Sequence, residues 1–217
     1  MEPPRSLLRR GFLSPIKGVN TLIEENWCQN YLADQKLYPF LEKVDADLAA
    51  TEHQGGCRYC SGKLHRADYK RKPRGMASWP DRPKRASFCC DQEGWRRRHT
   101  PPSVRFLGRR VYAGLVVVLV SAMVHGLKPA RVQRLRENLQ IDRRTLERWR
   151  QWWLVIFVES AFWKEARARF LPPLCQRTLP WSLCLSFAVQ EQRKRLLELL
   201  KFLAPLTTPE AWKELVM

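Results

Sequence analysis

The sequence predicts a mainly α-helical protein, a helical bundle that contains a helix-turn-helix and a small, irregular β insert. Three observations predict this fold class. Apolar residues recur at helical spacing before residue 53 and after residue 109. Between these stretches, residues 53–108 are interrupted by many glycines and prolines, which excludes long helices there. Cysteines are clustered in the same interrupted stretch, so a bound metal can replace a large apolar core.

The composition is that of a folded protein. The chain has 217 residues, of which 45% are hydrophobic and 11% aromatic, so we expect one ordinary domain or two small ones. The first residues lack the apolar core of a secretion signal. We therefore expect a cytoplasmic protein, in which the seven cysteines serve as metal ligands or core thiols more often than as disulfides.

Residues 1–52 are predicted to form an N-terminal helical arm. Prolines and glycines make residues 1–20 a loose segment, and apolar spacing predicts helix over 21–52. Pro39 lies inside this second part, and proline interrupts a helix interior, so two short helices are expected there.

Residues 53–108 are predicted to form a basic, zinc-ribbon-like segment of short strands and turns. Cys57 and Cys60 have the two-residue gap that lets both thiolates bind one zinc ion. The second half of the site is irregular, because Cys89 and Cys90 are adjacent and the next candidate is His99. Three sets of ligands stay open: Cys57 and Cys60 with Cys90 and His99, a set that uses Cys89 and Cys90 together, or one that recruits His53 or His65. The zinc is expected to be structural, since no H-x-E or HExxH element supplies a general base.

Residues 109–170 are predicted to form a helix-turn-helix domain. The apolar run 111–124 is too short to span a bilayer and predicts a buried helix, so no membrane contact is expected. A helix from residue 128, a turn at 138–141 and a second helix capped by Asp142 follow. The second helix is expected to bury Leu146, Trp149 and Trp153 and to extend as far as Ala168.

Residues 171–217 are predicted to form a C-terminal helical segment. Leu171-Pro172-Pro173 ends the preceding helix, and an amphipathic helix is expected over 182–203. The tryptophan-rich stretch 149–163 favours core packing or a homo-oligomer contact over base stacking.

Positive charge is concentrated in the middle of the chain. The net charge is +18, and +17 of it falls between residues 58 and 150. Lysine and arginine at this density favour a polyanion, because they neutralise phosphates and release counterions. Arginine near the start of a recognition helix can also read guanine. The residues expected to contact nucleic acid are Arg96, Arg97, Arg98, Arg105, Arg109, Arg143, Arg144, Arg148 and Gln151.

Several of these motifs together resemble a known family. The Cys57-x-x-Cys60 pair, Ser87-Phe88-Cys89-Cys90, the run from Arg96 to Arg110 and Ile141–Leu146 resemble small bacterial transposase-like proteins, which are related to the DNA-binding ends of insertion-sequence transposases. The resemblance covers about residues 55–155 and implies a zinc ribbon, a helix-turn-helix and double-stranded DNA as the partner in a mobile-element context. In such ribbons a cysteine is expected where this chain has Trp95.

The expected function is therefore DNA binding without catalysis, as a transposition accessory, a regulator or a transposase remnant associated with the nucleoid. After Asp142 the chain has no aspartate, and the 67 residues after 150 are too few for a ribonuclease-H-like domain with its metal-binding carboxylates. No nucleophile–base pair or phosphate-binding glycine loop indicates another enzyme. The alternatives are an RNA-binding or ribosome-associated zinc protein and a protein-interaction adaptor.

Overall fold

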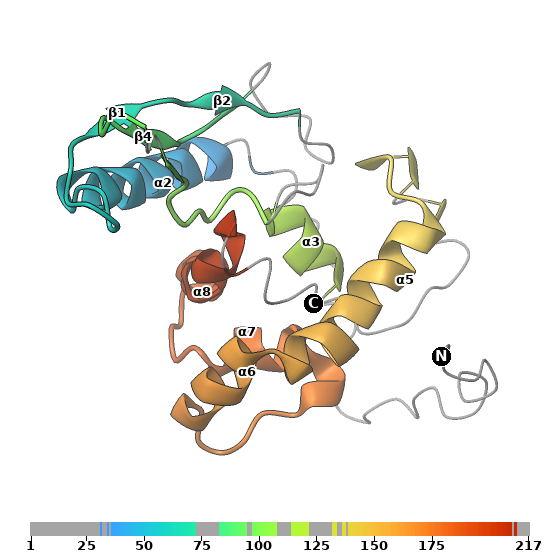
Figure 1. Ribbon diagram of the computed structural model, residues 1–217. Helices are drawn as coiled ribbons and strands as arrows, with labels where there is room; N and C mark the ends of the chain where they lie inside the picture. Colours follow the sequence, from blue (N-terminus) through green and yellow to red (C-terminus); the bar gives the residue numbers. More distant parts are fainter. Residues whose placement is uncertain are drawn as a thin grey trace, which may run out of the picture.

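The computed structural model describes residues 31, 34, 36–72, 83–94, 97–107, 114–121, 132–133, 136–137, 139–209 and 211. Within these residues the chain is mainly helical, with two small antiparallel sheets beside a group of cysteines (Figure 1). The predicted fold class is confirmed. The loose N-terminal segment 1–20 and Cys28 lie outside the described residues.

The first long helix, α2 (Leu37–Gln54), supports the cysteine-rich segment. The break predicted at Pro39 is wrong: among the residues described just before α2, 34 and 36 are not helical, and Pro39 lies in the first turn of α2. Proline is tolerated there because the N–H groups of the first turn have no partner inside the helix. The chain leaves α2 through Gly56, whose φ of +69° favours glycine.

Two short sheets cover α2. β4 (Phe88–Cys90) pairs on one edge with β1 (Leu64–Arg66) and on the other with β5 (Arg98–His99), and β2 (Tyr69–Lys70) pairs with β3 (Lys84–Arg85). All pairs are antiparallel. The apolar core beneath these strands is small and includes two of the cysteines; its members are Ala49, Cys57, Leu64, Phe88 and Cys90.

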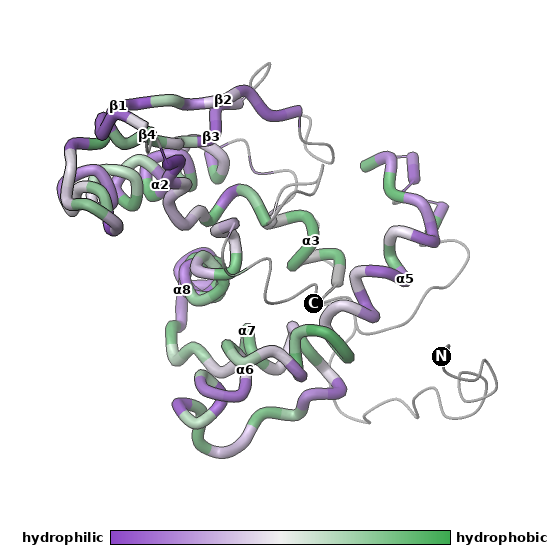
Figure 2. The backbone as a smooth tube through the Cα atoms, in the orientation of Figure 1, coloured by the Kyte–Doolittle hydropathy of each residue, from purple (hydrophilic) through white to green (hydrophobic). Residues whose placement is uncertain are grey.

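A second core joins the predicted helix-turn-helix to a hydrophobic helix. In α3 (Gly114–Ser121), Val116, Val117 and Val120 pack with Leu146 and Trp149 of α5 (Arg143–Gln151). Figure 2 shows α3 as mainly hydrophobic and the strand segment around β2 as mainly hydrophilic. None of the helices in the described part of the chain is long and apolar enough to cross a membrane.

The helix after Asp142 is shorter than predicted. It continues from α5 as a π-helix, η2 (Trp152–Phe157), and ends at Ser160, which begins α6 (Ala161–Ala166). The wider π turn brings Trp152, Trp153 and Phe157 into the core together. Trp152, Trp153 and Trp163 are buried within the chain, which agrees with core packing as the role of this tryptophan-rich stretch.

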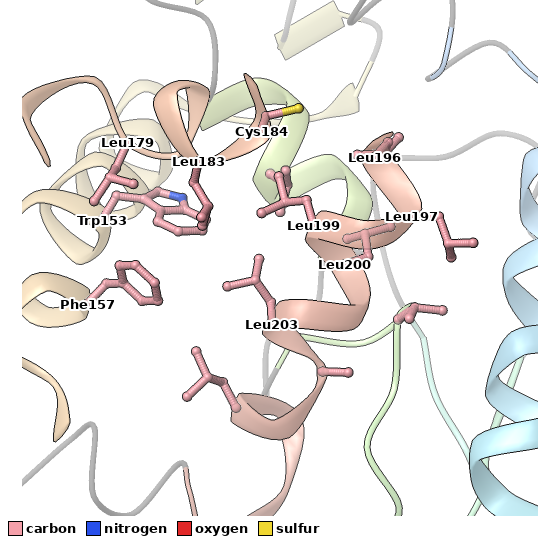
Figure 3. Packing of buried hydrophobic residues seen from close by; sticks show 14 of the residues in the cluster. Trp153, Phe157, Leu179, Leu183, Cys184, Leu196, Leu197, Leu199, Leu200 and Leu203 are labelled. Carbon is pink, nitrogen blue, oxygen red and sulfur yellow. The ribbon is translucent and has the colours of Figure 1, made fainter. Parts of the chain in front are cut away.

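The C-terminal segment contains two helices where the sequence predicted one. α7 (Trp181–Ser186) and α8 (Gln192–Leu203) are separated by residues 187–191, and Leu185 is exposed. Figure 3 shows leucines of α8 facing Trp153, Phe157 and Leu183. In the described residues after α6, short 3-10 helices lie between and after these helices: η3 (Arg167–Arg169), η4 (Gln176–Thr178) and η5 (Ala204–Thr207).

The largest core draws on all four predicted segments. Leu37 and Leu41 from α2, Val104 after the strands and Val118 from α3 belong to the same buried cluster as the apolar residues of η2, α6, α7 and α8. The cysteine-rich segment and the helices are therefore packed on a common centre.

Candidate metal centre

Three cysteines form a group that could hold a metal ion. The ligand atoms of Cys57, Cys60 and Cys90 lie within 4.8 Å of one another, and Cys60 Sγ is 3.2 Å from Cys90 Sγ. All three are free thiols. Two sulfurs on one tetrahedral zinc are about 3.8 Å apart, given Zn–S bonds of about 2.3 Å. The spacing thus suits a metal centre, as the sequence predicted for these three residues.

The turn from Cys57 to Gly62 brings two of the sulfurs together. The N–H of Ser61 donates to the carbonyl of Cys57 (2.7 Å), and the N–H of Cys57 donates to the carbonyl of Gly62 (2.9 Å). A Cβ at position 62 would lie 3.3 Å from the sulfurs of both Cys60 and Cys90, and 2.8 Å from Oδ1 of Asp91. Glycine at position 62 therefore lets the chain pass beside the sulfurs.

The thiols differ in their affinity for a proton. Burial opposes ionisation of Cys57, but the backbone N–H groups of Tyr59 and Cys60 and the neighbouring thiols outweigh it and lower the pKa of Cys57 to about 6. The N–H of Gln92 favours the thiolate of Cys90, yet burial and the charge of Cys57 raise the pKa of Cys90 to about 11. One thiol of the group ionises readily and a second one does so with difficulty. A bound cation would offset the repulsion between the two thiolate charges.

Strand register decides which of the adjacent cysteines faces inward. Successive side chains of a strand point to opposite faces, so Cys90 shares the inner face with Phe88 while Cys89 points outward. Cys90 is 2% exposed, and Cys89, opposite His65 on β1 and Arg98 on β5, is not among the three clustered cysteines. The ligand set that uses Cys89 together with Cys90 is therefore wrong.

His99 adjoins one of the three sulfurs, that of Cys57, but is not itself a member of the cysteine group. It lies opposite Phe88 on β5, which places it on the inner face, and its side chain is 1% exposed. Its Nε2 is 3.3 Å from Cys57 Sγ. On the other side of the ring, Nδ1 is 3.6 Å from Oε1 of Glu52, and Arg58 donates to the same carboxylate oxygen.

The other candidate histidines face elsewhere. His53 is bonded through Nε2 to the carbonyl of Leu64 (2.9 Å), and its ring packs on Phe88. His65 has an exposed side chain, 3.9 Å from Asp91. The ligand set that recruits either of them is not supported by their positions. Trp95 lies outside the described residues.

Basic side chains surround the cysteine group. Of the eleven Lys and Arg in 57–72, 83–94 and 97–107, nine are exposed or half-buried, against three acids in the same ranges. Two tyrosines lie among them: Arg97 is 4.5 Å from the ring centre of Tyr59, and Arg98 is 5.7 Å from that of Tyr69. The nine, which we call the ribbon cations, are Arg58, Lys63, Arg66, Lys70, Arg71, Lys72, Lys84, Arg97 and Arg98.

Arg105 was predicted to contact nucleic acid, and this is wrong. It is 5% exposed, and its guanidinium donates to Asp45 (2.8 Å), Tyr38 (2.7 Å) and Glu42 (2.9 Å). Burial alone would lower the pKa of Arg105, but Asp45 and the other partners hold it above its usual value. Arg105 therefore links the segment that follows β5 to helix α2 through hydrogen bonds.

Arg85, part of a basic run in the sequence, is also buried. It donates to the carbonyl of Pro101 (2.6 Å) and lies near Thr207 of η5, and burial lowers its pKa. The positions of Arg96 and Arg109 lie outside the described residues.

The turn before α5 has the predicted geometry. Gln140 adopts a φ of +54°, Ile141 is fully buried, and the carboxylate of Asp142 accepts from the N–H of Thr145 (2.7 Å). The predicted contact residues on α5 are exposed: Arg143, Arg144, Arg148 and Gln151. Arg143 pairs with Glu147 (2.9 Å), and Arg148 donates to Thr145 (2.9 Å).

Two further residues beside the cysteine group have no signal in the sequence motifs. Glu52 lies near the end of α2 and belongs to no cysteine or histidine motif, so no local pattern could indicate it. Tyr59, between the two ligands of the first pair, contacts the His99 ring at 5.5 Å. Comparison with known protein families, with curated proteins and with solved structures finds no match to this chain.

Proposed function

We propose that this protein binds double-stranded DNA, using the ribbon cations on the phosphate backbone and the exposed face of α5 in the major groove. In this proposal a zinc ion held by Cys57, Cys60 and Cys90 is structural and keeps the ribbon cations in place. The accessory, regulatory or remnant role beside a transposase is the part of the proposal that rests on the sequence resemblance.

One observation carries the proposal: nine of the eleven basic side chains in the described part of the ribbon are not buried. Cations spread over the two small sheets and the turns beside them can neutralise several phosphates at once, and this supplies affinity without sequence information. The exposed Tyr59, 45% accessible, adds a planar surface within the basic region.

The face of α5 has the composition of a recognition helix. Leu146 and Trp149 are buried against α3, so the opposite side presents Arg144, Arg148 and Gln151 to solvent. A nine-residue helix is about 14 Å long, and the major groove, about 12 Å wide, admits an α-helix. Arginine forms paired hydrogen bonds with guanine, and glutamine does so with adenine.

A mobility-shift titration of the full chain against random duplex, over a salt series, tests the proposal. We expect the logarithm of the binding constant to fall linearly with the logarithm of salt concentration. Arg97→Ala is expected to weaken binding to every duplex and to lower the salt slope by about 1. Arg144→Ala is expected to cost about 1–3 kcal/mol on a duplex selected from a random pool, and much less on random duplex.

The matched control is Arg177→Ala, which removes an exposed arginine from η4, away from both surfaces. Its binding and salt slope should equal those of the unmodified chain. Absence of binding at low salt, or binding that does not respond to salt, would contradict the proposal. Tighter binding to structured RNA than to duplex DNA would favour the ribosome-associated alternative instead.

A further inference from the structure

We infer that the fourth ligand of the metal centre is Nε2 of His99, and that Glu52 positions this imidazole from outside the ligand shell. The inference rests on the zinc centre of the proposed function and deepens it, by naming a Cys3His ligand set and a residue on α2 that supports it.

One distance brings His99 to the edge of the cysteine group. A sulfur and a nitrogen that share one tetrahedral zinc are about 3.6 Å apart, given bonds of about 2.3 Å and 2.0 Å. The observed separation of Cys57 Sγ and His99 Nε2 is 3.3 Å. Both residues are buried, at 1% and 2% exposed, so Nε2 is shielded from solvent beside Cys57. His99 is not within 4.8 Å of all three sulfurs, so ligation requires the imidazole to move toward the other two sulfurs when the ion binds.

The topology explains why this histidine reaches the site. Cys90 ends β4, and β5 runs antiparallel beside it, with the N–H of Cys90 bonded to the carbonyl of Arg97 (3.1 Å). His99 follows two residues later, opposite Phe88. The inner face of this strand pair thus presents Cys90 and His99 together, and Cys57 meets them from the turn after α2.

Glu52 occupies the place of an outer-shell partner. A histidine that binds zinc through one nitrogen commonly donates its other N–H to a carboxylate, which fixes the tautomer and the ring orientation. Glu52 Oε1 is 3.6 Å from Nδ1 of His99, within ion-pair reach. Arg58 holds the same oxygen, so the carboxylate is anchored beside the ring.

Titration of the full chain with Co²⁺, without DNA, tests both assignments. Tetrahedral Co²⁺ absorbs strongly in the visible, and its thiolate charge-transfer band grows with the number of bound sulfurs. The unmodified chain should show the tetrahedral spectrum with three thiolates. His99→Ala should lose most of the affinity, and His99→Cys should recover it with a stronger charge-transfer band. His65→Ala is the matched control and should leave affinity and spectrum unchanged.

A double-mutant cycle tests whether Glu52 acts by orienting the His99 ring or by a general effect on the stability of the fold. Glu52→Gln should weaken Co²⁺ binding by about 10- to 100-fold when His99 is present. In the His99→Cys background the same change should have little effect, because no imidazole remains to be oriented. An equal loss in both backgrounds would overturn the role of Glu52.

The outcomes distinguish this inference from the proposed function. If His99→Ala binds Co²⁺ with unchanged affinity and spectrum, the fourth-ligand assignment is overturned while the three-cysteine centre stands. If the unmodified chain binds no Co²⁺, the zinc centre and this inference both fail, and the salt-dependent DNA titration still decides DNA binding separately.

Discussion

At the scale of single residues, burial separates arginines that the sequence cannot tell apart. Arg97 and Arg105 both belong to the basic run that follows Cys90, yet Arg97 is exposed and Arg105 is not. The difference comes from Asp45, whose carboxylate accepts from Ser103, Val104 and Arg105. These partners are about sixty residues away in sequence, so no local pattern could predict them.

Asp45 and Arg105 form a buried ion pair. Asp45→Ala is expected to destabilise the protein by about 3–5 kcal/mol, because it leaves the charge of Arg105 buried with its main partner removed. Glu42→Ala removes another carboxylate that contacts the same guanidinium, but that carboxylate is 53% exposed. Its cost should stay below about 1 kcal/mol. Chemical denaturation measures both, and equal losses would show that burial of the carboxylate is not the cause.

At the scale of elements, local sequence signals predicted where segments begin better than how far they run. Asp142 begins α5 as predicted, because its cap depends only on the next three residues. The predicted helix past Ser160 is wrong, since Ser160 accepts from the N–H of Trp163 and begins a new helix there. Periodicity could not show the π turn at 152–157, which depends on packing against α8.

The cap of α5 gives a prediction about pH. The N–H of Thr145 and the nearby Arg148 hold the pKa of Asp142 below its usual value. A depressed pKa means that the carboxylate stabilises the fold above its ordinary pKa of about 4, and that this contribution is lost as pH falls through the lower, folded-state value. Thermal unfolding should find Asp142→Asn less stable than the unmodified chain near neutral pH.

The gap between the two proteins should close in acid, because the carboxylate is then protonated in both the folded and the unfolded chain. A stability difference that stayed constant from neutral pH down to about pH 3 would show that the charge of Asp142 is not responsible. Asparagine is a suitable control substitution since it also caps helices well.

At the scale of the molecule, the fold class and the first cysteine pair of the candidate metal centre were predictable because they depend on short-range patterns. Cys57 and Cys60 share a turn, and their two-residue gap is a local signal in the sequence. The choice between Cys89 and Cys90 needed the register with β1 and β5, which the sequence left open. The closeness of Glu52 to His99 depends on how α2 packs against the strands, which the sequence does not show.

Metal removal should have unequal effects across the chain. The apolar core under the strands is small, whereas that of η2, α6, α7 and α8 is extensive. A strong chelator is therefore expected to remove hydrogen-exchange protection from the strands while α8 stays protected. Cys90→Ser should reproduce this pattern without chelator, and Cys89→Ser should not. Uniform loss of protection along the chain would contradict a stabilising role confined to the ribbon.

Helix α2 carries a consequence for attempts to transplant the ribbon into another protein. Glu52, which lies 3.6 Å from His99 beside the cysteine group, and Asp45, which accepts from Arg105 after the strands, are both on this helix. The other end of α2 is held by Leu37 and Leu41 in the main core. A graft cut at Cys57 would leave these anchors behind, so the smallest portable unit begins at Leu37 and extends beyond Arg105.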